Sequence, residues 1–125
     1  MLRLVIVDDS SKFLAAARCW LERQEITVVG VASTVAQALG QVEELHPEVV
    51  LVDIDLGDES GFELANQLQG NAGADSSRVI LMSAYAEEDY AELIAASPAV
   101  GFLSKADLSG QRIRDLVGEG AGKEV

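Results

Sequence analysis

Five polar residues stand directly behind apolar runs that are typical of buried β-strands. They are Asp8 and Asp9 behind residues 2–7, Asp53 behind 49–52, Ser83 behind 78–82, and Lys105 behind 100–104. If these runs form neighbouring parallel strands, their carboxyl ends meet at one edge of a sheet, which is where open α/β folds place their chemistry. We therefore expect three carboxylates, one hydroxyl and one ammonium to converge on a single site.

The charges of this expected site indicate its chemistry. Carboxylates within a few ångströms of one another repel unless a cation compensates them, and their oxygens suit a hard ion such as Mg²⁺, which often joins carboxylates to a phosphate. Ser83 and Lys105 could bind the other oxygens of a phosphoryl group. Asp53 is then a candidate nucleophile, because a carboxylate can form an aspartyl phosphate. Alone, each residue is more often a helix cap or a solvated charge, so the prediction depends on their coincidence.

The hydrophobic pattern predicts five strands that alternate with five helices. The predicted strands cover residues 2–7, 27–32, 49–53, 78–83 and 100–104. The predicted helices cover residues 12–23, 35–45, 87–96 and 107–117, with a short one behind Ser60. This alternation indicates right-handed βαβ units and one parallel sheet. The predicted fold class is α/β, with a doubly wound five-stranded parallel sheet.

Short sequence patterns predict how two of the helices begin. Thr34 with Gln37, and Ser60 with Glu63, match the capping box, in which each side chain accepts a hydrogen bond from the other residue's backbone N–H. Both pairs precede apolar stripes at helical spacing. We therefore place helix starts at these two positions.

Apolar stripes predict which helix faces are buried. Phe13 and Trp20 fall on the stripe of the first helix, and are predicted to pack in or near the core. Tyr90, Leu93 and Ile94 recur at helical spacing in the fourth helix and are predicted to line one face.

The composition fits one domain of 125 residues with a single core. A formal charge of −12 and dispersed basic residues disfavour direct binding to nucleic acid or to anionic membranes. Cys19 is the only cysteine, which excludes an intrachain disulfide and a cysteine-based metal site. No apolar run reaches the ~18 residues that a membrane span needs. We expect a cytoplasmic protein.

The stretches described above resemble the receiver domain of two-component response regulators. The resemblance is carried by Val5-Ile6-Val7-Asp8-Asp9-Ser10, by Val50-Leu51-Val52-Asp53 with Gly61 eight residues on, by Leu81-Met82-Ser83-Ala84, and by Gly101-Phe102-Leu103-Ser104-Lys105. It implies a flavodoxin-like (β/α)5 fold with strand order 2-1-3-4-5. It also implies a receiver domain over residues 1–117, followed over 118–125 by a flexible tail or the start of a linker.

The resemblance implies a role for each acidic residue. Asp53 would be the phosphoacceptor, phosphorylated by a phosphohistidine donor. Mg²⁺, with Mn²⁺ as an alternative ion, would be held by the side chains of Asp8, Asp9 and Asp53 and by the backbone carbonyl of Asp55.

The resemblance also implies a switch. Ser83 and Lys105 would contact the phosphoryl oxygens, and Phe102, three residues before Lys105, would be the switch aromatic. Phosphorylation would draw Ser83 and Lys105 inward, reposition Phe102, and bias an equilibrium at the face formed by the fourth helix, fifth strand and fifth helix. Packing alone would make Phe102 a plain core residue.

The implied partners are those of a bacterial signalling protein. They are a sensor histidine kinase or phosphotransfer protein, an output domain or downstream protein, and, after phosphorylation, a second copy of the chain. The chain would not be an enzyme, apart from catalysing its own phosphorylation and dephosphorylation.

Four positions bear on how closely the chain follows the family. Asp55 and Tyr85 stand where receivers vary, and these positions influence the lifetime of the acyl phosphate. Gly57 and Ala106 stand where many receivers have proline, which concerns the stiffness of the loop after Asp53 and the peptide geometry at the lysine.

Two other classes of function compete with this interpretation. Asp53-Ile54-Asp55 after an apolar strand also resembles the nucleophile and acid/base pair of haloacid dehalogenase-type phosphatases, which would leave Asp8 and Asp9 without a role. The chain could also be a binding module, either a flavodoxin-like nucleotide binder or an inactive receiver fold kept for protein contacts. Turnover of small phosphate esters would favour the phosphatase, and Mg²⁺ affinity unchanged by Asp9→Ala would favour the inactive module.

Overall fold

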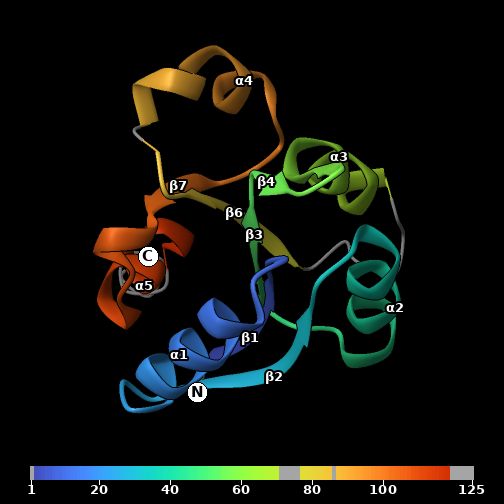
Figure 1. Cartoon of the computed structure of the whole chain (residues 1–125). Coiled ribbons are helices and arrows are strands. Elements are labelled where there is room, and N and C mark those ends of the chain that lie inside the picture. The colour runs from blue at the N-terminus through green and yellow to red at the C-terminus, as the bar shows by residue number, and fades with distance from the viewer. Residues whose placement is uncertain (1, 71–76, 86, 119–125) are drawn as a thin grey trace.

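Five largely apolar runs form the central sheet of the computed structural model, which describes residues 2–70, 77–85 and 87–118. The strands are β1 (Leu2–Val7), β2 (Ile26–Ala32), β3 (Val49–Asp53), β6 (Arg78–Ser83) and β7 (Gly101–Ser104). They pair in parallel in the order β2-β1-β3-β6-β7 (Figure 1). Counted along the chain, this order is 2-1-3-4-5, and the predicted topology is confirmed.

Helices cover both faces of the sheet (Figure 1). The α-helices are α1 (Ser11–Glu22), α2 (Val35–Leu45), α3 (Gly61–Gly70), α4 (Ala91–Ala96) and α5 (Gly110–Val117), and the short 3₁₀-helices are η2 (Glu87–Tyr90) and η3 (Lys105–Asp107). Side chains of α1 and α5 pack on one face of the sheet, whereas those of α2, α3 and α4 pack on the other. This is the predicted doubly wound α/β fold.

Alternating side chains along the inner strands divide the core into two layers. In β1, Leu4 and Ile6 face α1 and α5, whereas Val5 and Val7 face α2 and α3. Every residue of β3 is buried, as expected for a central parallel strand. Fully burying an aliphatic side chain contributes about 1.5–3 kcal/mol. Both layers therefore stabilise the sheet whose ends carry the polar residues.

The two predicted capping boxes differ from the simple pattern. Thr34 Oγ1 accepts a hydrogen bond from the N–H of Gln37 at 3.1 Å, as predicted, but the Gln37 side chain accepts from the N–H of Ser33 at 2.9 Å. Ser60 Oγ accepts from the N–H of Phe62 at 3.1 Å, only two residues on. Ser60 therefore caps α3, which begins at Gly61 as predicted, but its hydroxyl binds the N–H of Phe62 and not that of Glu63 as the capping box requires.

Three elements differ from the predicted pattern. The helix expected over residues 87–96 is divided into η2 and α4, and the helix expected over 107–117 begins only at Gly110, as α5, after the separate turn of η3. Ser109 caps α5, since its Oγ accepts from the N–H of Arg112 at 3.1 Å. The antiparallel hairpin of β4 (Asp55–Leu56) and β5 (Glu59–Ser60) was not predicted. Its turn depends on Gly57, at φ 73°.

Two residues of the predicted apolar stripes lie at the surface. Trp20 is 50% exposed, because Leu14, Ala17 and Leu21 form the face of α1 that meets the sheet. Leu93 is 56% exposed, and the short α4 has no buried residue. Periodicity placed both residues on apolar stripes, but the buried faces of α1 and α4 do not include them.

The chain's end and its hydropathy add two observations. Gly118 adopts φ 72° and ends α5, whereas residues 119–125 of the predicted tail lie outside the described residues. Within the described ranges, no helix combines the length and apolar character needed to cross a membrane.

Candidate functional site

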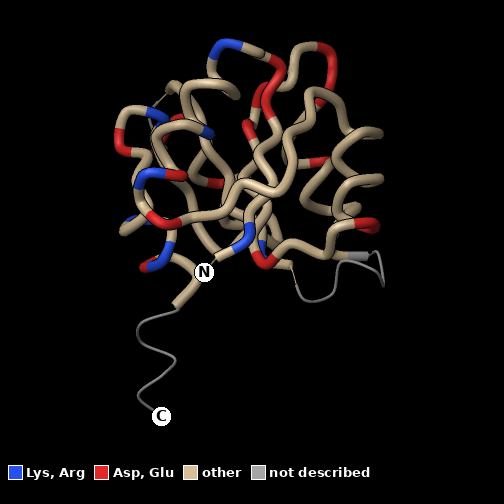
Figure 2. Tube along the Cα trace, turned by 90° about the horizontal axis from the view of Figure 1, so that it is seen from below, with Lys and Arg blue, Asp and Glu red and all other residues tan. Residues whose placement is uncertain are grey.

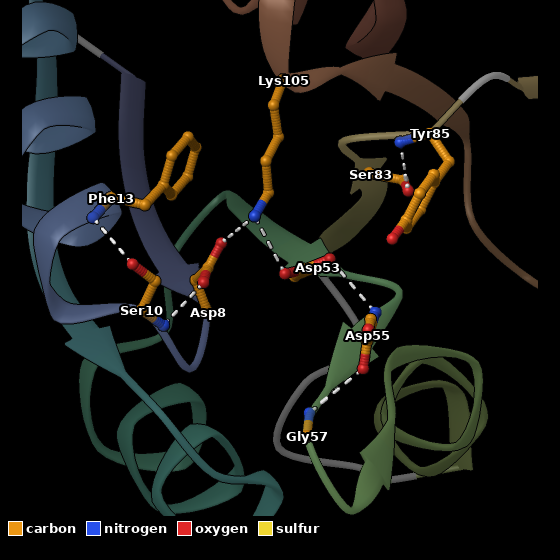
Figure 3. Close-up of polar contacts among 9 residues, drawn as sticks. All are labelled: Asp8, Ser10, Phe13, Asp53, Asp55, Gly57, Ser83, Tyr85 and Lys105. Atoms are coloured by element: carbon orange, nitrogen blue, oxygen red, sulfur yellow. Dashed lines mark hydrogen bonds and ion pairs between the residues drawn. The ribbon is translucent and has the colours of Figure 1, made fainter.

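The carboxyl ends of β1, β3, β6 and β7 bring the predicted polar residues to one edge of the sheet. Asp8 follows β1, Asp53 ends β3, Ser83 ends β6 and Lys105 follows β7. Figure 3 shows the Lys105 ammonium between Asp8 and Asp53, with Ser83 on the other side of Asp53. The order of these strands in the sheet is what places side chains almost 100 residues apart in contact.

Lys105 forms ion pairs with two buried carboxylates. Its Nζ lies 2.7 Å from Asp8 Oδ2 and 3.0 Å from Asp53 Oδ2. Asp8 is fully buried and Asp53 is 5% exposed. Buried charges need compensation, because removal from water penalises the ionised form. The single ammonium offsets part of this penalty for both acids.

Backbone N–H groups orient the other oxygens of the two carboxylates. Asp8 Oδ1 accepts from the N–H of Ser10 at 2.8 Å, at the start of α1. Asp53 Oδ1 accepts from the N–H of Asp55 at 3.1 Å. Each carboxylate is therefore fixed by the loop that follows its own strand, with its second oxygen turned to Lys105.

Burial raises the pKa of Asp53 to about 6. The hydrogen bonds from Lys105 and from the Asp55 N–H lower the pKa of this carboxyl, while the nearby Asp8 charge raises it, and the net effect is upward. Burial also lowers the pKa of Lys105, but the hydrogen bonds and charges of Asp8 and Asp53 outweigh it, so its pKa lies above the usual value. Lys105 is thus a permanent cation, whereas the protonation of Asp53 is sensitive to its surroundings.

The acidic residues fit a hard cation. Asp8, Asp9 and Asp53 each offer a carboxylate oxygen, and these oxygens lie within 4.8 Å of one another. Asp8 Oδ2 is buried and lacks a hydrogen bond of good geometry, so the Lys105 ion pair is its compensation. A compact set of carboxylate oxygens is the donor set that divalent cations such as Mg²⁺ select.

Ser83 and Phe102 are both buried. Ser83 is 1% exposed, and its Oγ accepts from the N–H of Tyr85 at 3.0 Å. Tyr85 is 60% exposed and its ring extends past Ser83 on the site's side (Figure 3). Phe102 is 9% exposed and packs in the core layer under α2, α3 and α4. The position of Phe102 is that of a core aromatic beside the end of β6.

The loop behind Asp53 folds back as a hairpin. Asp55 Oδ1 accepts from the N–H of Gly57 at 3.2 Å, so the Asp55 carboxylate points away from Asp53 (Figure 3). A proline could not replace Gly57, because its φ of 73° is far from the −65° that proline requires. The described residues contain no cis peptide bond, so the bond between Lys105 and Ala106 is trans.

Three residues make contacts at or near the site that were not predicted from the sequence. The Phe13 ring lies 4.4 Å from Lys105 Nζ, in cation–π geometry. Glu59 Oε1 accepts from the N–H of Val35 at 2.9 Å and joins the hairpin to the start of α2. Gly61 lies against the Asp53 backbone, which leaves no room for a side chain on Gly61. Of the three, only Gly61 could have been connected with the site from the sequence, through its spacing of eight residues from Asp53.

Charged residues are distributed unevenly around the sheet (Figure 2). The basic residues of α1 and α5 are mixed with acidic ones, and Arg18 pairs with Glu22 at 3.6 Å. The described parts of α2, α3 and α4 carry acidic residues and no basic ones. No wholly basic surface forms on the described helices.

Comparisons with known proteins agree on one protein family. The family model described as response regulator receiver domain matches residues 4–117. The uncharacterized transcriptional regulatory protein YvfU of Bacillus subtilis (strain 168) is 32% identical over 106 residues, which cover 84% of this chain and 52% of that protein. The DNA-binding transcriptional activator EvgA of Escherichia coli (strain K12) is 29% identical over 101 residues, which cover 81% and 48%. The chain spans about half the length of these curated relatives.

A solved structure has the same fold. The signal receiver domain of the response regulator NarL from Mycobacterium tuberculosis superposes with a TM-score of 0.79 at 28% sequence identity. The match covers 97% of this chain and 96% of that one.

Proposed function

This chain belongs to the response regulator receiver domain family, and on that basis we propose that it is a signalling switch phosphorylated on Asp53. The observation that carries the proposal is the contact of Lys105 with both Asp8 and Asp53 at the carboxyl edge of the sheet. A structural ion pair would need one acid, whereas phosphoryl transfer needs clustered acids for a cation and a lysine for the phosphoryl group.

The metal-binding part of the proposal follows from the donor atoms. Asp8, Asp9 and Asp53 would hold Mg²⁺ or Mn²⁺ through carboxylate oxygens, with the Asp55 carbonyl as a further ligand. A bound Mg²⁺ would supply neutralisation of the charge on the transferring phosphoryl group. The carboxylates of Asp8, Asp9 and Asp53 would hold the positive charge of the ion next to the phosphoryl group.

Asp53 would act as the nucleophile in its ionised form. One of its oxygens forms a bond to phosphorus, while the bond between phosphorus and the donor's histidine nitrogen breaks and the nitrogen keeps the electron pair. Lys105 would then pair with a phosphoryl oxygen. Because Ser83 Oγ accepts from the Tyr85 N–H, the hydroxyl proton of Ser83 remains free to donate to another phosphoryl oxygen.

Dephosphorylation would return the site to its starting state. A water molecule attacks phosphorus, and Asp53 leaves as a carboxylate with inorganic phosphate released. The protein would thus catalyse only its own phosphorylation and dephosphorylation and no turnover of other substrates. Asp55 and Tyr85, which flank the site, would tune the lifetime of the acyl phosphate.

The output step would use the face made by α4, β7 and α5. Drawing Ser83 and Lys105 towards the phosphoryl group changes the ends of β6 and β7, next to buried Phe102. We propose that Phe102 is the switch aromatic and that phosphorylation shifts the populations of two arrangements of this face.

The partners and boundaries are inferred from the family. We infer a histidine kinase or phosphotransfer protein as donor, and an output domain or downstream protein as receiver of the signal, with a phosphorylation-dependent homodimer as one form of output. No direct contact with nucleic acid or membrane is proposed for this chain. Residues 1–117 would form the receiver domain and 118–125 a tail or linker start, in a bacterial, cytoplasmic protein.

Labelling by acetyl phosphate tests the proposed function. With Mg²⁺, the purified chain should gain one phosphoryl group per molecule, detected by mass spectrometry, and the gain should be lost with EDTA. Asp53→Asn should abolish labelling, whereas Asp58→Asn, at an exposed acid of the nearby turn, should not. Steady hydrolysis of small phosphate esters would instead identify a phosphatase.

Direct titration with Mg²⁺ distinguishes an active receiver from an inactive one. Asp9→Ala should weaken Mg²⁺ binding at least tenfold, because it removes one of three clustered carboxylates. An unchanged Mg²⁺ affinity would support a receiver fold kept only for protein contacts.

A further inference from the structure

The indole of Trp20 holds a segment that begins at the site. Its Nε1 donates to the backbone carbonyl of Leu108 at 3.0 Å, across 88 residues of sequence. Trp20 is 50% exposed and contributes little to the core, because α1 packs on the sheet through other side chains. A tryptophan that stays half in water while its N–H binds a distant carbonyl indicates a tether.

The tethered segment is weakly held by its own hydrogen bonds. Lys105 begins η3, and the turn is closed by the Leu108 N–H to the Lys105 carbonyl at 3.5 Å and by the Ala106 N–H to Ser104 Oγ at 3.3 Å. Both distances lie at or beyond the long end of the usual range. The backbone that carries Lys105 therefore depends on contacts from outside the turn.

Helix α1 and its C-terminal turn supply those contacts. Besides the Trp20 bond, Gln24 Oε1 accepts from the N–H of Gly110 at 2.6 Å. Closer to the site, the Phe13 ring lies 4.4 Å from Lys105 Nζ. Phe13, Trp20, Lys105 and Leu108 also line a groove of about 270 Å³ between α1 and the segment. Lys105 and Leu108 thus share this groove with side chains of α1, and the Lys105 ammonium lies over the Phe13 ring.

We propose that Trp20 is a positioning residue for Lys105, because it fixes the backbone from which the ammonium reaches Asp8 and Asp53. The proposal rests on the proposed role of Lys105 in phosphoryl transfer. A catalytic group displaced by about 1 Å can cost about 10²-fold in rate. A tether only three residues from Lys105 controls such a displacement directly.

Trp20→Phe tests the tether, since phenylalanine keeps a ring in the groove and removes the N–H. We expect labelling of Asp53 by acetyl phosphate to slow by about two- to tenfold, as for the loss of one hydrogen bond. Arg114→Met is the matched control: Arg114 donates to the backbone carbonyls of Gln24 and Glu25 at 2.8 and 3.4 Å, so it joins α5 to the turn after α1 by side-chain bonds other than the one that Trp20 makes to Leu108. Its labelling rate should stay at the wild-type value.

A second readout follows the lysine itself in the metal-free chain. The sequence has only three lysines, at positions 12, 105 and 123, so ¹⁵N-lysine labelling gives assignable ammonium signals. The Lys105 signal should be protected from exchange in the wild type and in Arg114→Met, and broadened in Trp20→Phe. Urea unfolding should show similar stability losses for both variants.

The two readouts separate the outcomes. An unchanged Lys105 signal and labelling rate in Trp20→Phe would overturn the proposal, and so would an equal slowing of labelling and an equal broadening of the Lys105 signal in Arg114→Met. If the wild type takes no label at all, the proposed function fails, and the lysine signal alone then decides whether Trp20 positions Lys105.

Discussion

Gly61 lies against the backbone of Asp53 so closely that no side chain fits between them. A Cβ on Gly61 would stand 2.2 Å from the Asp53 carbonyl oxygen, and the Gly61 N–H donates to the Ile54 carbonyl at 2.8 Å. The first residue of α3 thus packs on the residue proposed as phosphoacceptor. This contact gives a physical reason for a glycine eight residues after Asp53.

Gly61→Ala should therefore disturb both the fold and the site. We expect the free energy of unfolding to fall by about 1–3 kcal/mol, the usual cost of overpacking, and labelling of Asp53 to slow. Urea unfolding and acetyl phosphate labelling measure the two effects. Gly40→Ala is the control, because its Cβ would meet nothing within 4 Å and α2 should gain about 0.5–1 kcal/mol. Equal stability of the two variants would contradict the prediction.

Gly57 links the hairpin to the proposed metal site. Its φ is 73°, and a Cβ there would lie 3.2 Å from Asp9 Oδ2. Gly57→Ala should lower stability by about 1 kcal/mol through backbone strain, and should also weaken Mg²⁺ binding by displacing Asp9. Calorimetric titration with Mg²⁺ measures the second effect.

Gly118→Ala provides the control for this strain. Gly118 has φ 72° but nothing within 4 Å of its Cβ position, so its replacement should cost similar stability and leave Mg²⁺ affinity unchanged. If both variants bind Mg²⁺ like the wild type, the hairpin does not position Asp9.

The raised pKa of Asp53 makes the stability of the metal-free chain depend on pH. Between the ordinary value of 3.8 and the folded value of about 6, the folded state binds more protons than the unfolded state. The free energy of unfolding therefore falls as pH rises through this window. Each pKa unit corresponds to about 1.4 kcal/mol, so Asp53 contributes a loss of at most about 3 kcal/mol.

Asp53→Asn should remove this contribution. In EDTA, its stability relative to the wild type should increase from pH 4 to pH 6 and then level off, measured by urea unfolding. Taking the difference between the two proteins cancels the titration of the other acids. A difference that does not vary with pH would show that burial does not penalise the Asp53 carboxylate.

The strands and the site could be predicted from the sequence because both depend on simple patterns. Each apolar run ends at a polar residue, and parallel pairing then brings Asp8, Asp53 and Lys105 together whatever the details of the loops. The position of Trp20 could not be predicted, because helical periodicity does not distinguish a core side chain from one whose indole N–H has a partner at Leu108.

The hairpin behind Asp53 was missed for a different reason. Two strands of two residues each are too short to give a periodic signal, and they depend on the left-handed backbone of Gly57. Likewise, the contact between Phe13 and Lys105 joins residues 92 apart in sequence, and no local pattern records it.

Asp55 offers a test of how the surroundings of the site set the lifetime of the acyl phosphate. Its carboxylate accepts from the Gly57 N–H, and asparagine can make the same hydrogen bond through its carbonyl oxygen. Asp55→Asn therefore removes a charge while keeping the turn.

Because the Asp55 carboxylate points away from Asp53, it acts only through its electric field in solvent, worth about 1 kcal/mol or less. The anion should favour an attacking water as that water loses its proton, so we expect the variant to lose phosphate about two- to threefold more slowly. Decay of the labelled protein after removal of acetyl phosphate measures this rate, with Asp58→Asn as the exposed-charge control. The same lifetime in wild type and Asp55→Asn would exclude Asp55 as a tuning residue.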